Sequence, residues 1–79
     1  MSAQESKAIA VVKRHLELQY GHPVRATFAV ASADWGFQVN FTDVQCNSNT
    51  RGQWDRVPEG FGEVFLSQDL YVIQASIGP

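Results

Sequence analysis

The side chains that could take part in catalysis are few in this 79-residue sequence, and three of them lie close together. His15 and Gln19 are one helical turn apart, and Tyr20 follows directly. A histidine titrates near neutral pH and can move protons in a reaction. The three residues fit two interpretations: a polar pocket between a helix and a sheet, or a histidine at the edge of the core. We favour the second, because the sequence assigns no carboxylate that would orient the imidazole.

The other reactive groups do not form a recognisable catalytic or metal site. Cys46 is the single cysteine, and a nucleophilic thiolate would need His15 or His22 within hydrogen-bonding distance. A lone cysteine more often fills a small apolar space. One cysteine and two histidines also fall short of the four ligands of a structural zinc site. The sequence therefore predicts a protein that is not an enzyme and that has no cofactor and no metal.

Composition excludes two classes of partner and limits the protein to one domain. The six Lys and Arg residues are scattered and the net charge is −2, whereas nucleic-acid binders carry a dense basic patch. No apolar run approaches the roughly 20 residues of a membrane span. With no signal-peptide pattern and no cysteine pair, we expect a cytoplasmic protein. The length predicts a single small α+β domain over residues 1–79.

The first twenty residues predict one helix. Ser2 and Glu5 fit a capping box, Gly21 occupies the position of a left-handed C′ residue, and Pro23 prevents continuation.

The apolar side of this helix is unusually broad. It spans roughly 200° of the circumference and ends at Val11 and Leu18, which is wider than one sheet face needs. We therefore expect something outside the chain to cover Val11 and Leu18.

After Pro23 the apolar period changes to two, which indicates β-strands. Alternation predicts strands over residues 24–31 and 35–46, with a bulge near Thr42–Asp43 where the parity shifts. Residues 51–57 form a third predicted strand, and residues 63–66 and 70–77 form a hairpin around Ser67–Asp69. The predicted fold is α+β, an N-terminal helix packed on an antiparallel meander of four to five strands in the order α-β-β-β-β-β.

The two tryptophans allow two placements each. Trp35 shares its parity with Phe37 and Val39, which favours the core, and Trp54 fits the core edge or the surface equally well. On the surface, Trp54 would form a patch with Arg25 and Arg56, and tryptophan and arginine are the usual anchors of binding surfaces.

These observations favour a non-enzymatic protein–protein interaction module, a small accessory or regulatory protein that binds a protein partner or its own copy as a homodimer. The predicted interaction surface comprises Val11, Leu18, Arg25, Trp54 and Arg56. The alternative is a small-ligand-binding or enzymatic domain whose pocket is lined by His15, Gln19 and Tyr20. We expect no nucleic-acid and no membrane partner.

Overall fold

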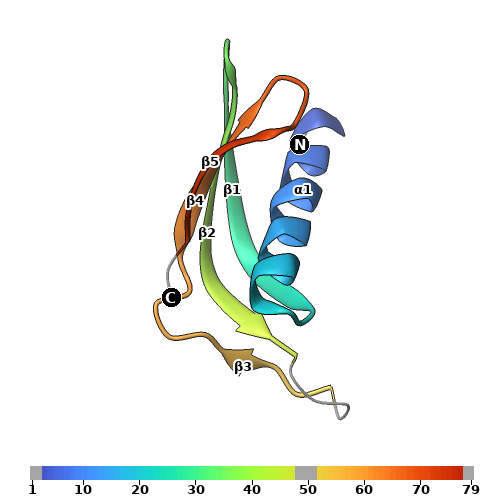
Figure 1. Ribbon diagram of the computed structural model, residues 1–79, viewed down its shortest axis with the longest axis vertical. Coiled ribbons are helices and arrows are strands. Elements are labelled where there is room, and N and C mark those ends of the chain that lie inside the picture. Colours follow the sequence, from blue (N-terminus) through green and yellow to red (C-terminus); the bar gives the residue numbers. More distant parts are fainter. Residues whose placement is uncertain (1–2, 48–51, 78–79) are drawn as a thin grey trace.

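The computed structural model describes residues 3–47 and 52–77, which form one helix and a five-stranded antiparallel sheet (Figure 1). The prediction of an N-terminal helix followed by an antiparallel meander is confirmed. In chain order the elements are α1 (Ala3–Tyr20), β1 (Val24–Ala33), β2 (Gly36–Cys46), β3 (Asp55–Arg56), β4 (Gly62–Ser67) and β5 (Val72–Ile77).

The sheet has the strand order β1-β2-β4-β5, and the short β3 pairs with the far end of β2. β1 and β2 form a long hairpin whose turn is Asp34–Trp35, since Ala33 is paired with Gly36. β4 pairs with β2 on one side and with β5 on the other. The two edges of the sheet are therefore β1 and β5.

The helix ends where the sequence predicts. Gly21 has a φ of 73°, and its N–H donates to the Glu17 carbonyl oxygen at 2.8 Å. The Glu17 carboxylate then accepts a hydrogen bond from the Val24 backbone N–H at 3.1 Å, which ties the end of α1 to the start of β1. The predicted cap residue Ser2 lies outside the described residues.

The core lies between α1 and one face of the sheet. Helix residues Ala8, Val12 and Leu16 are fully buried, and each buried side chain of the size of leucine contributes about 1.5–3 kcal/mol. The sheet contributes alternate residues of β1, β2 and β4, as the period of two predicts; the buried ones are Val24, Phe37, Val39, Phe41, Val44, Cys46, Val64 and Leu66.

The bulge predicted near Thr42–Asp43 is present. Thr27 pairs with Thr42 while Arg25 pairs with Gln45, so Asp43 and Val44 together face the single residue Ala26. Asp43 adopts a φ of 54° there. Because of this extra residue, Val44 and Cys46 face the core although their sequence parity differs from that of Phe41.

Several placements differ from the prediction: β1 continues to Ala33 and β5 begins at Val72. Trp35 is not in the core: it lies in the β1–β2 turn, 49% exposed, and its ring is 5.7 Å from that of Phe65 on the opposite face of the sheet. The strand predicted to begin at Trp35 begins at Gly36. The third strand is also shorter than expected, because only Asp55–Arg56 pair with β2 and Arg51 lies outside the described residues.

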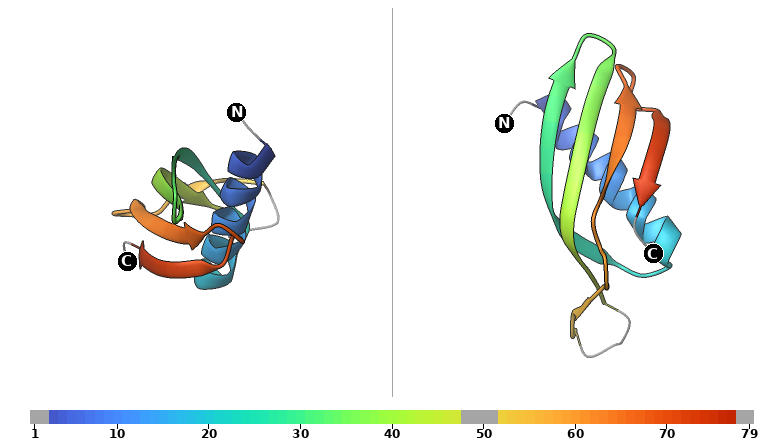
Figure 2. Two further views of the ribbon diagram at one scale, coloured as in Figure 1. Left: turned by 90° about the horizontal axis from the view of Figure 1, so that it is seen from above. Right: turned by 90° about the vertical axis from the view of Figure 1, so that its left-hand side faces the viewer.

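The helix crosses the sheet diagonally (Figure 2). Its N-terminal half lies behind β1, and its C-terminal half lies behind β5. As a result, the beginning of β5, at the end of the sheet near the β4–β5 turn, has no helix above it.

Candidate functional site

The most apolar exposed segment of the described chain is the free edge strand β5 together with the residue before it. Tyr71 is 73% exposed, Ile73 is 59% exposed and Val72 is 40% exposed. Along β5 every residue is exposed except Ile77, which is half-buried against the core. Contiguous exposed apolar residues of this size mark a binding surface more often than isolated ones do.

This edge lacks the features that normally prevent strands from pairing between molecules. Edge strands are usually protected by lysine, proline or inward-pointing charges. The segment from Leu70 to Ile77 contains no charged residue and no proline. Among the residues that the structure describes, β5 pairs with β4 and with no other strand.

β5 is held in place by β4 and by its own turn. The pairs Gly62–Ile77, Val64–Ala75 and Phe65–Gln74 set the register. A Cβ atom on Gly62 would overlap the Ser76 carbonyl oxygen, so glycine is required for this close approach.

Ser67 and Gln68 fix the position of the β4–β5 turn. The Ser67 hydroxyl accepts a hydrogen bond from the Tyr71 N–H at 3.1 Å, and the Ser67 N–H donates to the Tyr71 carbonyl at 2.8 Å. The Gln68 side-chain amide donates to the carbonyl oxygens of Ala33 and Asp34, which connects this turn to the β1–β2 turn.

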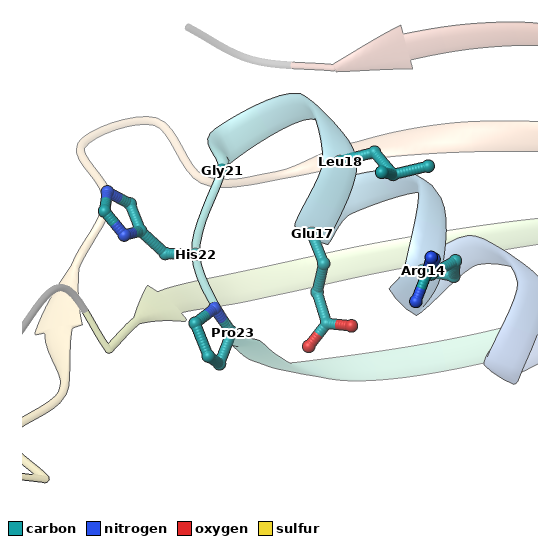
Figure 3. Close-up of a pocket in the computed structure, with 6 residues that line it drawn as sticks. All are labelled: Arg14, Glu17, Leu18, Gly21, His22 and Pro23. Atoms are coloured by element: carbon teal, nitrogen blue, oxygen red, sulfur yellow. The ribbon is translucent and has the colours of Figure 1, made fainter.

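The helix adds an exposed apolar side chain near its C-terminal end. Leu18 is 70% exposed, and its side chain lies along α1 on the half of the helix nearer β4, whereas Glu17 points toward β1 (Figure 3). Val11, the other residue predicted to lie at this border, is half-buried and packs against the core. Of the two residues predicted at the edge of the helix's apolar side, Leu18 is exposed and Val11 is not.

The remaining predicted interface residues gather at the other end of the sheet. The Arg25 guanidinium carbon lies 4.6 Å from the centre of the Trp54 ring, a cation–π contact. Arg25 also donates from Nε to the Gln45 side-chain oxygen at 2.8 Å. Gln45 pairs in turn with Arg56 on β3. Arg25, Trp54 and Arg56 therefore form one group, at the β3 end of the molecule and away from the start of β5 (Figure 1).

The residues predicted to line a pocket differ in exposure. His15 and Tyr20 are half-buried and Gln19 is exposed. None of the three lines the hollow at the C-terminal end of α1 or the three hollows along the sheet around Ser76, Gln45 and Gly60. Burial raises the pKa of the Tyr20 hydroxyl, and the neighbouring Cys46 raises that pKa further.

Cys46 is buried, and its thiol is free. Burial raises the pKa of Cys46, and the charge of Asp55 adds to this. A raised thiol pKa keeps the group protonated at neutral pH, which is the opposite of what a nucleophilic cysteine needs.

A hollow of about 390 Å³ lies at the C-terminal end of α1 (Figure 3). It is lined by Arg14, Glu17, Leu18, Gly21, His22 and Pro23. A small-molecule site needs polar groups that converge on one point. Here the Glu17 carboxylate is turned to the Val24 N–H, and the His22 ring projects away from Glu17 (Figure 3).

No protein-family model, curated protein or solved structure matches this chain. Within residues 3–47 and 52–77, no helix is long and apolar enough to cross a membrane. The same residues contain no group of three or more His, Cys, Asp or Glu side chains arranged to hold a metal ion.

The sequence reasoning missed Tyr71, Val72 and Ile73 as surface residues. Alternation alone assigned them to a strand without showing that the helix passes elsewhere. The available signal was the uncharged run from Leu70 to Ile77, since edge strands are usually protected by charged residues or proline.

Proposed function

We propose that this protein is a non-enzymatic interaction module that binds another protein strand along the free edge of β5. The observation that carries this proposal is a strand edge that pairs with no other strand in residues 3–47 and 52–77, that exposes Tyr71, Val72 and Ile73, and that carries no charge.

Strand addition explains why both features occur together. An edge strand offers a row of backbone N–H and C=O groups, and a second strand satisfies them with main-chain hydrogen bonds. The exposed side chains of Val72 and Ile73 then lose contact with water against the incoming strand, at about 25 cal/mol per Å² of apolar area. Backbone pairing supplies the geometry and the apolar side chains supply much of the affinity.

Leu18 extends the proposed binding surface from the sheet to the helix, because it is exposed on the C-terminal half of α1, which lies behind β5 (Figure 2). The group formed by Arg25, Trp54 and Arg56 remains a predicted second contact, more polar and separate from the first. We retain a cytoplasmic location as part of the proposal, since the one cysteine of the chain is an unpaired thiol.

The test compares substitutions on the two edges of the sheet. Ile73→Lys places a charge on the proposed edge, and Thr27→Lys places the same charge on an exposed position of β1. Tagged wild type and both variants are used to capture proteins from lysate of the native host, after thermal unfolding has shown all three to be folded. We expect Ile73→Lys to reduce the amount of captured protein about tenfold, equivalent to about 1.4 kcal/mol of binding energy.

Thr27→Lys should leave the captured amount within about twofold of wild type, because an exposed substitution away from the interface has little effect. Equal capture by wild type and Ile73→Lys would show that β5 is not the binding surface.

A further inference from the structure

We infer that the strand that adds to β5 is β5 of a second copy, antiparallel, with Ala75 facing Ala75 across a two-fold axis. This inference rests on the proposed function, because it names the partner of the same edge. The two are tested separately below.

The residue pattern of β5 is self-complementary. Ile73, Gln74, Ala75, Ser76 and Ile77 read apolar, polar, small, polar, apolar, and this order is the same in both directions. Two antiparallel strands related by a two-fold axis present this pattern to each other reversed. With Ala75 at the centre, Ile73 faces Ile77 of the second copy and Gln74 faces Ser76 of the second copy.

This register also keeps each face of the sheet continuous. Ala75 lies opposite Val64 on the core face, and Gln74 lies opposite Phe65 on the outer face. Leu66 is paired with Val72 and Phe65 with Gln74, so Val72 and Ile73 together oppose Leu66 at a bulge. Ile73, Ala75 and Ile77 thus share the core face, and the polar residues Gln74 and Ser76 share the outer face. A shift of one residue would instead set apolar against polar side chains.

Charge favours a second copy over a charged partner strand. The proposed interface from Leu70 to Ile77 carries no charge, so two identical strands meet without repulsion. Two β5 strands paired in this way lie at the usual strand spacing of about 4.8 Å.

The helices lie on the same side of the combined sheet and close to the axis. The C-terminal half of α1 lies behind β5 (Figure 2), and Leu18 lies on the half of the helix nearer β4 (Figure 3). The start of β5, which has no helix of its own chain above it, lies opposite the end of β5 in the second copy. The exposed Leu18, near the C-terminal end of α1, therefore lies at the end of the sheet where β5 of one copy meets the start of β5 of the other.

The first experiment measures molar mass by light scattering and sedimentation between about 1 µM and 1 mM, a range that covers the affinities of small interfaces. We expect the mass of wild type to rise from that of one chain to that of two. Ile73→Lys should weaken this dimer at least tenfold, and Thr27→Lys should not change it. A wild-type protein that stays monomeric at 1 mM would overturn the inference.

The second experiment tests the register by oxidative cross-linking. In the proposed dimer the two Cα atoms of residue 75 are about 4.5–5.5 Å apart, within disulfide range. We expect Ala75→Cys to form a covalent dimer, and Ala31→Cys on β1 and the parent chain with buried Cys46 to stay monomeric. Gln74→Cys should cross-link more slowly, because residue 74 faces residue 76. Equal rates for Ala75→Cys and Ala31→Cys would overturn the inference.

The failures of the two proposals are distinguishable. If the protein is monomeric and Ile73→Lys still abolishes capture of another protein from lysate, the β5 edge binds a different strand and only the dimer is wrong. If Ile73→Lys changes neither self-association nor capture, both proposals are wrong.

Discussion

The two edges of the sheet contain similar kinds of residue but present different surfaces. β1 includes Phe28 and Val30, and β5 includes Val72 and Ile73. On β1 the large apolar side chains pack partly against the core, and its exposed residues are small or polar, namely Arg25, Thr27, Ala29, Ala31, Ser32 and Ala33. On β5 the large apolar side chains are exposed.

The difference arises from the path of the helix and not from the hydrophobicity of the strands. The N-terminal half of α1 lies behind β1, and α1 reaches β5 only with its last turns (Figure 2). The start of β5 thus keeps a strand-like apolar pattern without a layer to cover it. In this two-layer fold, the direction in which one helix crosses the sheet leaves the start of β5 uncovered.

The largest effect is expected on stability, from replacing Gly62, where β4 and β5 approach closely. In Gly62→Ala the added methyl group overlaps the Ser76 carbonyl oxygen and comes within 2.8 Å of the Phe41 ring. We expect the free energy of unfolding to fall by roughly 2–4 kcal/mol, as for other overpacked positions. Urea denaturation followed by tryptophan fluorescence measures this, because Trp35 rests on Phe65 of β4.

The control for this prediction is Gly21→Ala. Gly21 has a positive φ, but no heavy atom lies within 4 Å of an added Cβ. Its cost should be about 1 kcal/mol, from backbone strain alone. A cost for Gly62→Ala no larger than that of Gly21→Ala would contradict the close approach of β4 and β5.

The next prediction compares Val11, which packs against the core, with Leu18, which is exposed on the same helix. Val11→Asp buries a charge against the core, and we expect it to lower the free energy of unfolding by about 1–3 kcal/mol. Leu18→Asp, at a 70% exposed position, should change it by less than about 0.5 kcal/mol. Leu18→Asp should instead weaken self-association severalfold, measured by sedimentation. If both variants unfold the domain equally, Leu18 belongs to the core.

A smaller effect is expected when β1 is made to resemble β5. The double variant Ala29→Ile, Ala31→Ile adds two β-branched apolar side chains to the exposed β1 edge. We expect weak additional association, visible by light scattering only above about 100 µM, and abolished when Thr27→Lys is added. If the double variant does not associate more than wild type, larger apolar side chains on an edge strand are not sufficient for self-association in this fold.

The smallest effect is a response to alkaline pH that begins near the start of β1. Cys46 pairs with Val24 at the start of β1, and the pKa of Cys46 is raised in the folded state. The unfolded chain releases the thiol proton at its ordinary pKa while the folded chain keeps it. Stability is therefore constant below that pKa and falls as the pH rises through it.

Amide hydrogen exchange measures this response residue by residue. At pH values above the ordinary thiol pKa, after correction for intrinsic exchange rates, we expect earlier opening near Val24 than near Ala75. The Cys46→Ala variant should remove part of the pH dependence. Equal acceleration along β1 and β5 would contradict a local origin at Cys46.

Most of the fold was predictable because its signals are local. The change of apolar period at Pro23, the C′ position of Gly21 and the parity shift at Asp43 each correspond to a structural feature at the same residue. The placement of Trp35 was not predictable from parity, since a two-residue turn takes it out of the strand. Gly36 follows with a φ of 151°, a value that glycine adopts readily and other residues rarely.

The site was less predictable because it depends on relations between distant segments. The stacking of Arg25 on Trp54 requires the register of β1 with β2, and Trp54 lies just before β3, which pairs with β2. The exposure of Leu18 follows from the width of the helical arc, and the structure places it at the surface. The exposure of Ile73 depends on the direction in which α1 crosses the sheet, which no local pattern encodes.

The two hydrogen bonds of Gln68 have a consequence for the entropic cost of the proposed binding at β5. This side chain joins the β4–β5 turn to the β1–β2 turn, across 35 positions of sequence. The turn that leads into β5 is thereby fixed before any partner arrives, so docking does not have to order it. A pre-organised strand loses less conformational entropy on association than a mobile one. Replacing Gln68 should therefore weaken binding at β5 without removing any residue from the contact surface.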